Sequence, residues 1–357
     1  MNTHAKSAVA SESLHGSSLY RLAIVGAASL KGKEIAEVLN DRNFPSIDVK
    51  LLDDNESLGQ LESVGEEVTF IQKVRAEEFY HVDFTFFACD HESTRKSWKL
   101  ARDAGSAIVD LSFALVEEAG AAVRSPWIER QLGLTVVPEL QPGPAVIAHP
   151  AAVVLALLLL RVQKAVPVTR VAATVFEPAS EHGQKGMDEL HQQTVNLLSF
   201  QGLPKKVFDT QVAFNMVSRY GEQSAPTLAA VEGRVLKHYR QIAGREAPVP
   251  SLLLLQAPIF HGHAFAIHVE TGSVADLESM AHALEGEHVN VTHGPDDAPS
   301  NVSAAGQGDI QVTALADTNQ PNAFWLWASS DNLRIAAATA VECAETMAAT
   351  RPRGQIQ

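Results

Sequence analysis

The sequence predicts an α/β protein with a Rossmann-type doubly wound parallel sheet, followed by an α+β domain with an antiparallel or mixed sheet. Apolar strand patterns alternate with helical patterns as far as residue 160, which is typical of a parallel sheet covered on both faces. From residue 168 the pattern changes, and strands near 264–270, 309–314 and 324–328 indicate the second domain. A continuous apolar run at 151–160 lies between the two parts.

Composition limits the functional classes that need to be considered. The chain has 357 residues, of which 46% are hydrophobic, and this length favours two domains. A net charge of -14 would repel a nucleic-acid backbone, so we expect no nucleic-acid partner. Cys89 and Cys343 are far apart and offer neither metal-ligand spacing nor a disulfide framework, which fits a reducing cytoplasm. Residues 1–19 are polar and predict a disordered tail without a signal peptide.

The first strand, at 20–25, leads into a loop of small residues and then a helix with an apolar stripe. In a dinucleotide-binding fold such a loop brings backbone N–H groups to a pyrophosphate at the start of the helix. The spacing here is Gly26-x-x-Ser29-x-x-Gly32, which is one glycine short of the usual pattern. The candidate nucleotide contacts are Gly26, Ala28, Ser29 and Leu30. An ordinary turn between strand and helix explains the same residues equally well.

The second strand, at 47–52, ends in the acidic run Asp53, Asp54, Asn55 and Glu56. A carboxylate at this strand end accepts a hydrogen bond from a ribose 2′-hydroxyl, whereas a 2′-phosphate needs a cation. The run therefore favours NAD over NADP, and an acidic solvated turn is the alternative. Later strands are expected at 82–89, 107–111 and 135–138, with a helix at 93–104.

The stretch from Val146 to Leu160 lies at the centre of the predicted organisation. A short strand at 146–148 stops at His149-Pro150, and proline favours the first turn of the apolar helix that follows. The start of such a helix stabilises an anion or a thiolate. The residues present are Ala151 and Ala152, which carry no reactive group. The alternative is a core helix behind a tight turn, and the run is shorter than the ~20 apolar residues of a membrane span.

The second domain begins with a strand at 171–176, a polar loop at 177–183 and a helix that carries Met187 and Leu190 on its apolar face. A helical region at 225–243 and a strand at 252–255 follow. The last helix, at 332–349, is long enough to return to the first domain. We therefore expect a dinucleotide-binding domain at 20–147 plus 332–349 and a second domain at 148–331.

These motifs together resemble the aspartate-semialdehyde dehydrogenase family from Tyr20 to about Met347. The resemblance depends on their number, order and spacing. In chain order, the matching pieces are Gly26-x₅-Gly32, Val109-Asp110-x-Ser112, Val136-Val137-Pro138-Glu139, Ile147-Ala148-x-Pro150, Ser180-x-x-Gly183-x-Lys185-Gly186-Met187-Asp188-Glu189-Leu190, Ala213-Phe214-Asn215, Ala257-Pro258-Ile259-Phe260-x-Gly262-His263, Val269-Glu270-Thr271 and Asp331-Asn332-Leu333-Arg334. A branch that lacks the family cysteine, described as aspartate-semialdehyde dehydrogenase-like, resembles the chain more closely.

The resemblance implies a dimeric enzyme that reduces aspartyl phosphate with NADPH through a cysteine thioester. It places the nucleophilic cysteine at Ala152, the substrate-positioning glutamine at Glu177 and the carboxylate-binding arginine at Gln256. A phosphate-binding arginine falls on Val116. His263 is the retained acid/base. The resemblance also assigns Asn332 to the cofactor site.

Three hypotheses follow from these replacements. The first is a non-catalytic, homodimeric relative that serves as a partner or regulator of another, unknown protein. It binds NAD(P), with NAD favoured, or binds no nucleotide. The second is an NAD(P)-dependent dehydrogenase of altered mechanism in aspartate-family amino-acid biosynthesis, which would need another nucleophile such as Cys89.

The third hypothesis is a new zinc or hydrolytic site. His261 and His263 lie two apart on a strand and are therefore expected to face the same side. His149, Glu177 and His182 fall on loops that surround the catalytic pocket in the family. Histidines in a polar pocket are more often only hydrogen-bonded, so we assign no metal ligands.

Overall fold

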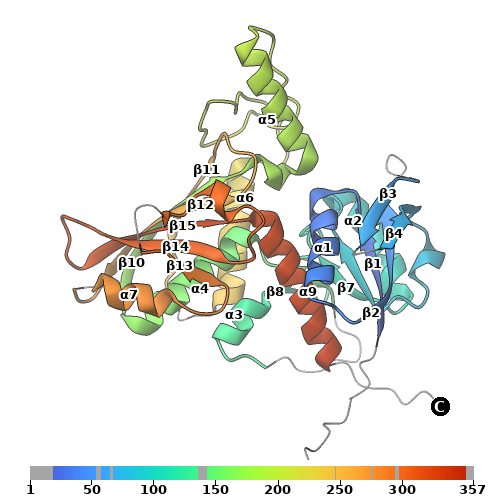
Figure 1. Ribbon diagram of the computed structural model, residues 1–357, viewed down its shortest axis with the longest axis horizontal. Helices are drawn as coiled ribbons and strands as arrows, with labels where there is room; N and C mark the ends of the chain where they lie inside the picture. The colour runs from blue at the N-terminus through green and yellow to red at the C-terminus, as the bar shows by residue number, and fades with distance from the viewer. Residues whose placement is uncertain are drawn as a thin grey trace, which may run out of the picture.

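The computed structural model describes residues 19–53, 58–64, 67–135, 143–245, 247–274, 276–293 and 297–350 (Figure 1). Asp54, Asn55 and Glu56 lie outside these ranges. The same holds for 136–138 of the strand expected at 135–138. The strands and helices described below occupy two sheets and the layers around them.

A parallel sheet forms the amino-terminal half, as predicted. Its strand order is β5-β2-β1-β6-β7-β9-β8, and every neighbouring pair is parallel. The strands are β1 (Tyr20–Val25), β2 (Ser46–Asp53), β5 (Gln72–Lys73), β6 (Phe84–Phe87), β7 (Ala107–Asp110), β8 (Ala122–Arg124) and β9 (Ala145–Ile147). A separate antiparallel pair is formed by β3 (Leu61–Val64) and β4 (Glu67–Phe70).

Helices cover both faces of this sheet, as the alternation of side chains along β1 requires. Leu22 and Ile24 belong to one apolar cluster with α1, whereas Ala23 and Val25 belong to another with Trp98 of α2. The helical segments of this half are α1 (Leu30–Asp41), η1 (Ala76–Phe79), α2 (His91–Asp103) and α3 (Pro126–Gln131). The fold class is therefore the predicted doubly wound one.

The last helix, α9 (Asn332–Thr350), returns from the second domain and packs against α1, as predicted (Figure 1). Its residues Ala337, Val341 and Ala344 are buried in the same apolar cluster as Ile35. The last helix thus completes the apolar packing around α1 in the amino-terminal half.

A mixed sheet forms the second half, with the order β11-β10-β12-β15-β14-β13. The two outer pairs, β10–β11 and β13–β14, are parallel, and the other pairs are antiparallel. The strands are β10 (Val168–Glu177), β11 (Ser251–Gln256), β12 (His263–Thr271), β13 (Val289–Val291), β14 (Ile310–Ala316) and β15 (Ala323–Ser330). The expected antiparallel or mixed sheet is a mixed one.

The central helix α4 (Pro150–Ala165) lies against this sheet together with α6 (Leu228–Ala243) and α7 (Leu277–Leu284). Helix α6 begins later than the predicted residue 225, because Thr227 caps it by accepting the N–H of Ala230. The remaining segments are η2 (Ala179–His182), α5 (Gly183–Leu198) and α8 (Asn301–Ala304). Helix α5 projects away from the body of the molecule (Figure 1).

In the part of the chain that the structure describes, no helix combines the length and apolarity needed to cross a bilayer.

Candidate active site and nucleotide loop

The predicted turn from strand to helix lies at the start of α4. Pro150 is the first helical residue, and His149 caps the helix, with its Nδ1 atom 3.3 Å from the backbone nitrogen of Ala151. The backbone N–H of Ala152 donates to the carbonyl of His149 at 2.8 Å, and the Ala152 side chain is fully buried. The helix start therefore holds a methyl group in a closed environment, as the sequence predicts.

Two predicted site residues, Glu177 and His263, contact each other. Glu177 ends β10 and His263 begins the neighbouring antiparallel strand β12, so their side chains meet, with Oε2 3.3 Å from Nε2. Both residues are buried, at 1% and 0% exposure. Burial raises the pKa of Glu177, although the nearby imidazole favours the ionised carboxylate. Glu177 Oε1 and His263 Nδ1 have no hydrogen-bond partner among the described residues.

A second acid–imidazole contact lies beside the first. His149 Nε2 is 3.8 Å from Oε2 of Glu181, and the His149 and His263 rings are 5.8 Å apart between centroids. Burial holds the pKa of His149 well below its usual value, and the neighbouring imidazoles act in the same direction. His149 is therefore a neutral ring in this cluster at neutral pH.

Gln256, at the position that the resemblance gives to an arginine, has its amide fully engaged by the protein. Its Oε1 accepts from the Tyr220 hydroxyl at 2.7 Å, and its Nε2 donates to the carbonyls of Glu177 and Ala257. Because the Tyr220 proton goes to Gln256, His182 Nε2 must donate to the Tyr220 oxygen, at 2.8 Å. No atom of the Gln256 amide is left to bind a substrate carboxylate.

Asn332, which the resemblance assigns to the cofactor site, connects the start of α9 to two other segments of the chain. Its Oδ1 accepts from the Ser180 hydroxyl and from the Gly262 N–H, and its Nδ2 donates to Glu181 at 2.8 Å. The residue is completely buried at the start of α9. Its side chain positions Glu181 beside His149, in the cluster that also contains Glu177 and His263.

The nucleotide loop has glycines where the backbone comes close to other parts of the chain. Gly26 has φ +85°, and a Cβ there would lie 2.5 Å from the Cys89 nitrogen. A Cβ on Gly32 would lie 2.2 Å from the Gly26 carbonyl oxygen. The packing of the loop against its neighbours therefore requires both glycines, whether or not a phosphate binds.

The remaining loop residues are ordered by short polar contacts. Ser29 Oγ accepts the N–H of Gly32 and donates to the Ala88 carbonyl, both at 3.0 Å. Asp53 lies at the loop as predicted, where its carboxylate accepts the N–H of Ala28 at 2.9 Å. Leu30, the other candidate, begins α1 and is half-buried.

Two cations near these groups were missed by the sequence reasoning. Lys31 Nζ lies 4.9 Å from the centroid of the Phe113 ring, and the guanidinium of Arg234 lies 5.0 Å from the same centroid. Lys31 also donates to the Leu111 carbonyl at 3.3 Å. Lys31 is the second residue of α1, the helix that follows the loop, so its place in the sequence could have identified it as a candidate phosphate contact. Arg234 lies on distant α6, and its place follows only from packing.

Cys89 does not have the environment of a nucleophile. Burial raises the pKa of its thiol to about 12, and its sulfur lies 3.2 Å from the Thr94 hydroxyl oxygen. A thiolate is the reactive form, so this cysteine is almost entirely protonated at neutral pH. Val116, at the position that the resemblance gives to a phosphate-binding arginine, is a half-buried aliphatic residue after β7.

The expectation that His261 and His263 share a strand face is wrong. β12 begins only at His263, and Gly262 turns the chain in front of it with φ +80°. Within the described ranges, no group of three or more histidine, cysteine, aspartate or glutamate side chains has the geometry to hold a metal ion.

Comparison with known proteins gives matches along almost the whole chain. Residues 21–144 match the semialdehyde dehydrogenase NAD binding domain, and residues 159–335 match the semialdehyde dehydrogenase dimerisation domain. A USG-1 protein homolog of Azotobacter vinelandii is 30% identical over 91% of this chain and 97% of its own length. An aspartate-semialdehyde dehydrogenase of Rickettsia bellii is 28% identical over 93% of this chain and 98% of its own length. The structure of a probable aspartate-semialdehyde dehydrogenase from Pseudomonas aeruginosa superimposes with a TM-score of 0.80 at 28% identity, covering 92% of this chain and 98% of that one.

Proposed function

Because the chain belongs to the semialdehyde dehydrogenase family, we propose that it is a dimeric, nucleotide-binding member that does not carry out the thioester reaction. The observation that carries this proposal is the buried methyl of Ala152 at the start of α4. A thioester needs a sulfur nucleophile, and an alanine side chain cannot form one. Cys89 does not replace it, because its thiol is protonated at neutral pH.

The substrate positions support the same proposal. An anionic acyl phosphate would meet the carboxylate of Glu177 and the already saturated amide of Gln256. Like charges repel strongly where water is excluded. The family substrate therefore lacks the cation that the resemblance expects at position 256.

The loop at the start of α1 suits a nucleotide phosphate. Ser29 caps the N–H of Gly32, which leaves the earlier N–H groups of Leu30 and Lys31 as the ones that a phosphate would accept from. Lys31 belongs to the same helical turn, and its ammonium, over the Phe113 ring, adds a positive charge on this side of the loop. Asp53 at the end of β2 favours NAD over NADP. A bound nicotinamide would supply hydride-transfer chemistry.

The outer face of the mixed sheet suits a second copy of the chain. Trp325 is 41% exposed and Leu315 is 49% exposed, and they pair in register across β14 and β15. His268 of β12 pairs with Trp325 on the same face. Pro299, before α8, accepts a hydrogen bond from Trp327 on this face, whereas Trp325 and Leu315 stay partly exposed to solvent in the part of the chain that the structure describes. A twofold dimer would bury this face.

A dehydrogenase of altered mechanism is the second candidate, because one observation favours it. Glu177 Oε1 and His263 Nδ1 are buried without partners in the described chain, and a buried polar atom of this kind is costly unless a ligand satisfies it. His263 could then move a proton while Glu177 orients its ring. Such chemistry would need no sulfur nucleophile.

Titration of the purified protein with NADH and NADPH, followed by nicotinamide fluorescence, tests the proposal. We expect saturable binding with NADH preferred, weakened in Lys31→Met and unchanged in the matched variant Lys33→Met. We also expect no phosphate-dependent NAD(P) reduction with aspartate semialdehyde above an enzyme-free control. Failure of both nucleotides to bind would overturn the nucleotide part, and robust semialdehyde oxidation would overturn the non-catalytic part.

A further inference from the structure

A cavity of about 620 Å³ opens between α3, the carboxyl-terminal end of α4 and the segment from α7 to β13. This volume lies within the range of small-molecule binding pockets. Neither Ala152 nor Glu177 nor the nucleotide loop contributes to its wall. The charged and aromatic side chains that line it are Trp127, Arg130, Arg161, Lys164, His282, Glu285, Glu287 and His288.

Arg161, in the wall of this cavity, is a buried cation held by neutral oxygens. It is 7% exposed, and its Nη1 and Nη2 atoms donate to the carbonyls of Leu284 and Glu287, both at 2.6 Å. Its Nε donates to the Gln131 side chain at 3.4 Å. In the described part of the chain it forms no salt bridge, so its charge is not neutralised by direct contact with a carboxylate. A buried charge of this kind is stabilised by an anion beside it.

Lys164 follows Arg161 by three residues on α4 and lines the same cavity. Residues three apart on a helix are neighbours on its surface. The Lys164 side chain is exposed and makes no hydrogen bond or ion pair with any residue that the structure describes. The two cations therefore lie side by side at one wall.

The carboxylates of the cavity are already paired with other groups. Glu287 lies 3.3 Å from Arg130 Nε and 3.5 Å from His288 Nε2. Glu285 lies 3.1 Å from His282 Nδ1. The Glu287 carboxylate also acts electrostatically on Arg161, beyond ion-pair distance. The Lys164 ammonium has no partner among the described residues, so its positive charge is available to a ligand.

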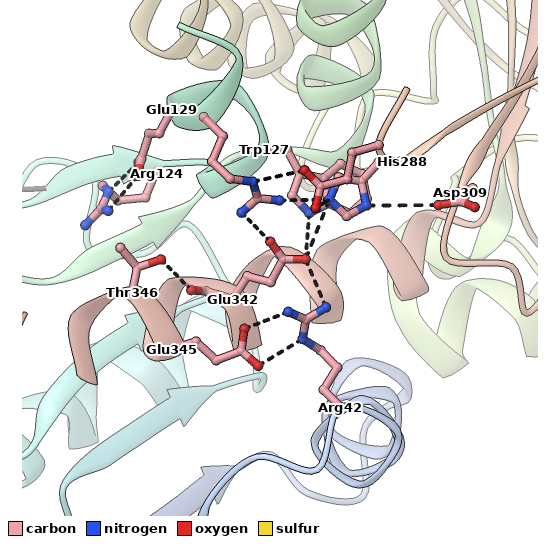
Figure 2. Close-up of polar contacts among 11 residues, drawn as sticks. Arg42, Arg124, Trp127, Glu129, His288, Asp309, Glu342, Glu345 and Thr346 are labelled. Carbon is pink, nitrogen blue, oxygen red and sulfur yellow. Dashed lines mark hydrogen bonds and ion pairs between the residues drawn. The ribbon is translucent and has the colours of Figure 1, made fainter. Parts of the chain in front are cut away.

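The opposite wall is rigidly built (Figure 2). The His288 ring stacks on Trp127 with centroids 3.9 Å apart and planes 6° from parallel. Glu342 of α9 accepts from Trp127 Nε1 at 3.1 Å and from Arg130 Nη1 at 2.8 Å. His288 has φ 66°, an uncommon conformation for a residue other than glycine, and the stack holds it there. A wall fixed in this way loses little entropy when a ligand binds.

From these contacts we propose that the cavity is a second binding site, for a small dianion of the phosphate or dicarboxylate class. Arg161 and Lys164 would hold the anionic groups, and the Trp127–His288 wall would limit the ligand to a small size. This site is independent of the nucleotide loop and of the Glu177–His263 pair.

Isothermal titration calorimetry of the full chain with inorganic phosphate and with succinate, at constant ionic strength in chloride, tests the site. We expect saturable binding of at least one of them in the millimolar range or tighter. Lys164→Glu should weaken it by about tenfold or more, because a charged hydrogen bond is lost. Ala165→Trp should weaken it as well, by filling the cavity edge without changing charge. Lys205→Glu, an exposed charge reversal elsewhere, should bind like the unaltered protein.

The outcomes separate the two ligand sources and the two sites. Binding of phosphate alone assigns the site to phosphate compounds, and binding of succinate alone assigns it to dicarboxylates. Phosphate held by Lys31 and Arg234 instead would survive both cavity substitutions, and that result would overturn the proposal. Absence of binding by both probes would also overturn it, whatever the nucleotide titration shows.

Discussion

The imidazole of His263 lies 3.3 Å from the carboxylate of Glu177, and neither side chain reaches solvent. In a thioester mechanism the histidine would instead serve a sulfur nucleophile. The carboxylate partner changes what the ring can do, because a buried acid at this distance orients the ring. Under the proposed function, the site thus keeps a proton-transfer group although Ala152 offers no nucleophile.

Glu177→Gln should stabilise the protein at pH 8 and change little at pH 4.5. The folded pKa of Glu177 is raised by burial, so its favourable contribution is complete below the unfolded value near 4.5 and is lost as pH rises through the folded pKa. Removing the titrating carboxyl group should therefore raise the free energy of unfolding by about 1 kcal/mol at pH 8. Urea denaturation at both pH values measures it, with the exposed Glu222→Gln as control. Equal effects at both pH values would contradict the assignment.

Ala152→Cys alone should not restore semialdehyde oxidation. The new thiol would stand at the start of α4, where a thiolate is favoured, but Gln256 and Val116 would leave the anionic groups of the substrate without their cations. A coupled assay with aspartate semialdehyde, NAD(P) and phosphate measures the gain. Because position 152 is buried in the fold, alkylation by iodoacetamide after unfolding should confirm that the introduced thiol is present and reduced. A turnover rate well above the unaltered protein would refute this account.

Acidification from pH 7 to pH 5 should destabilise the fold through buried histidines. Burial lowers the pKa of His182 and of His238 from 6.5 to about 4. The unfolded chain therefore takes up these protons first, and stability present above about pH 6.5 is lost as pH falls. Each of the two histidines should lower the free energy of unfolding by roughly 2 kcal/mol at pH 5, compared with its value above pH 6.5. His182→Gln should reduce the pH dependence of the unfolding free energy by that amount, whereas the exposed His191→Gln should not.

Glu342→Gln should destabilise the protein more than Glu345→Gln, although the two residues lie one turn apart on the same helix, α9. Glu342 is buried and contacts Arg42, Arg130 and Trp127, whereas Glu345 is partly exposed and pairs with Arg42 only (Figure 2). We expect a loss of about 2 kcal/mol for the first, because both arginines can be partly rehydrated, and less than about 1 kcal/mol for the second. Chemical denaturation compares them, and equal losses would argue against a central role for Glu342.

Trp325→Asp should convert the proposed dimer to a monomer. A charge in the centre of an apolar sheet face would have to be buried without a partner in the interface. Light scattering coupled to size-exclusion chromatography measures the mass at micromolar concentration. Leu100→Asp on α2, a residue of similar exposure, should leave the mass unchanged. A monomeric mass for the unaltered chain would reject the dimer itself.

Features set by local chemistry were predicted correctly from the sequence. Proline at 150 and the apolar run behind it gave the start of α4, and the loop at Gly26–Gly32 lies between β1 and α1 as expected. His261 was misplaced because the turn at Gly262 separates it from β12. Arg234 could not be predicted, since its position over Phe113 depends on how α6 packs against a distant loop. The Glu342 contacts likewise join segments that no sequence pattern connects.

The return of α9 to the first sheet has a consequence for how the protein is made. Ile35 and its neighbours on α1 share an apolar cluster with Val341 of α9, and more than half of the chain is translated between them. Because translation proceeds from the amino end, the nucleotide-loop half emerges from the ribosome with this surface still uncovered. Its final layer is added only after α9 itself has left the ribosome. The carboxyl-terminal helix thus sets the moment at which the amino-terminal half can finish folding.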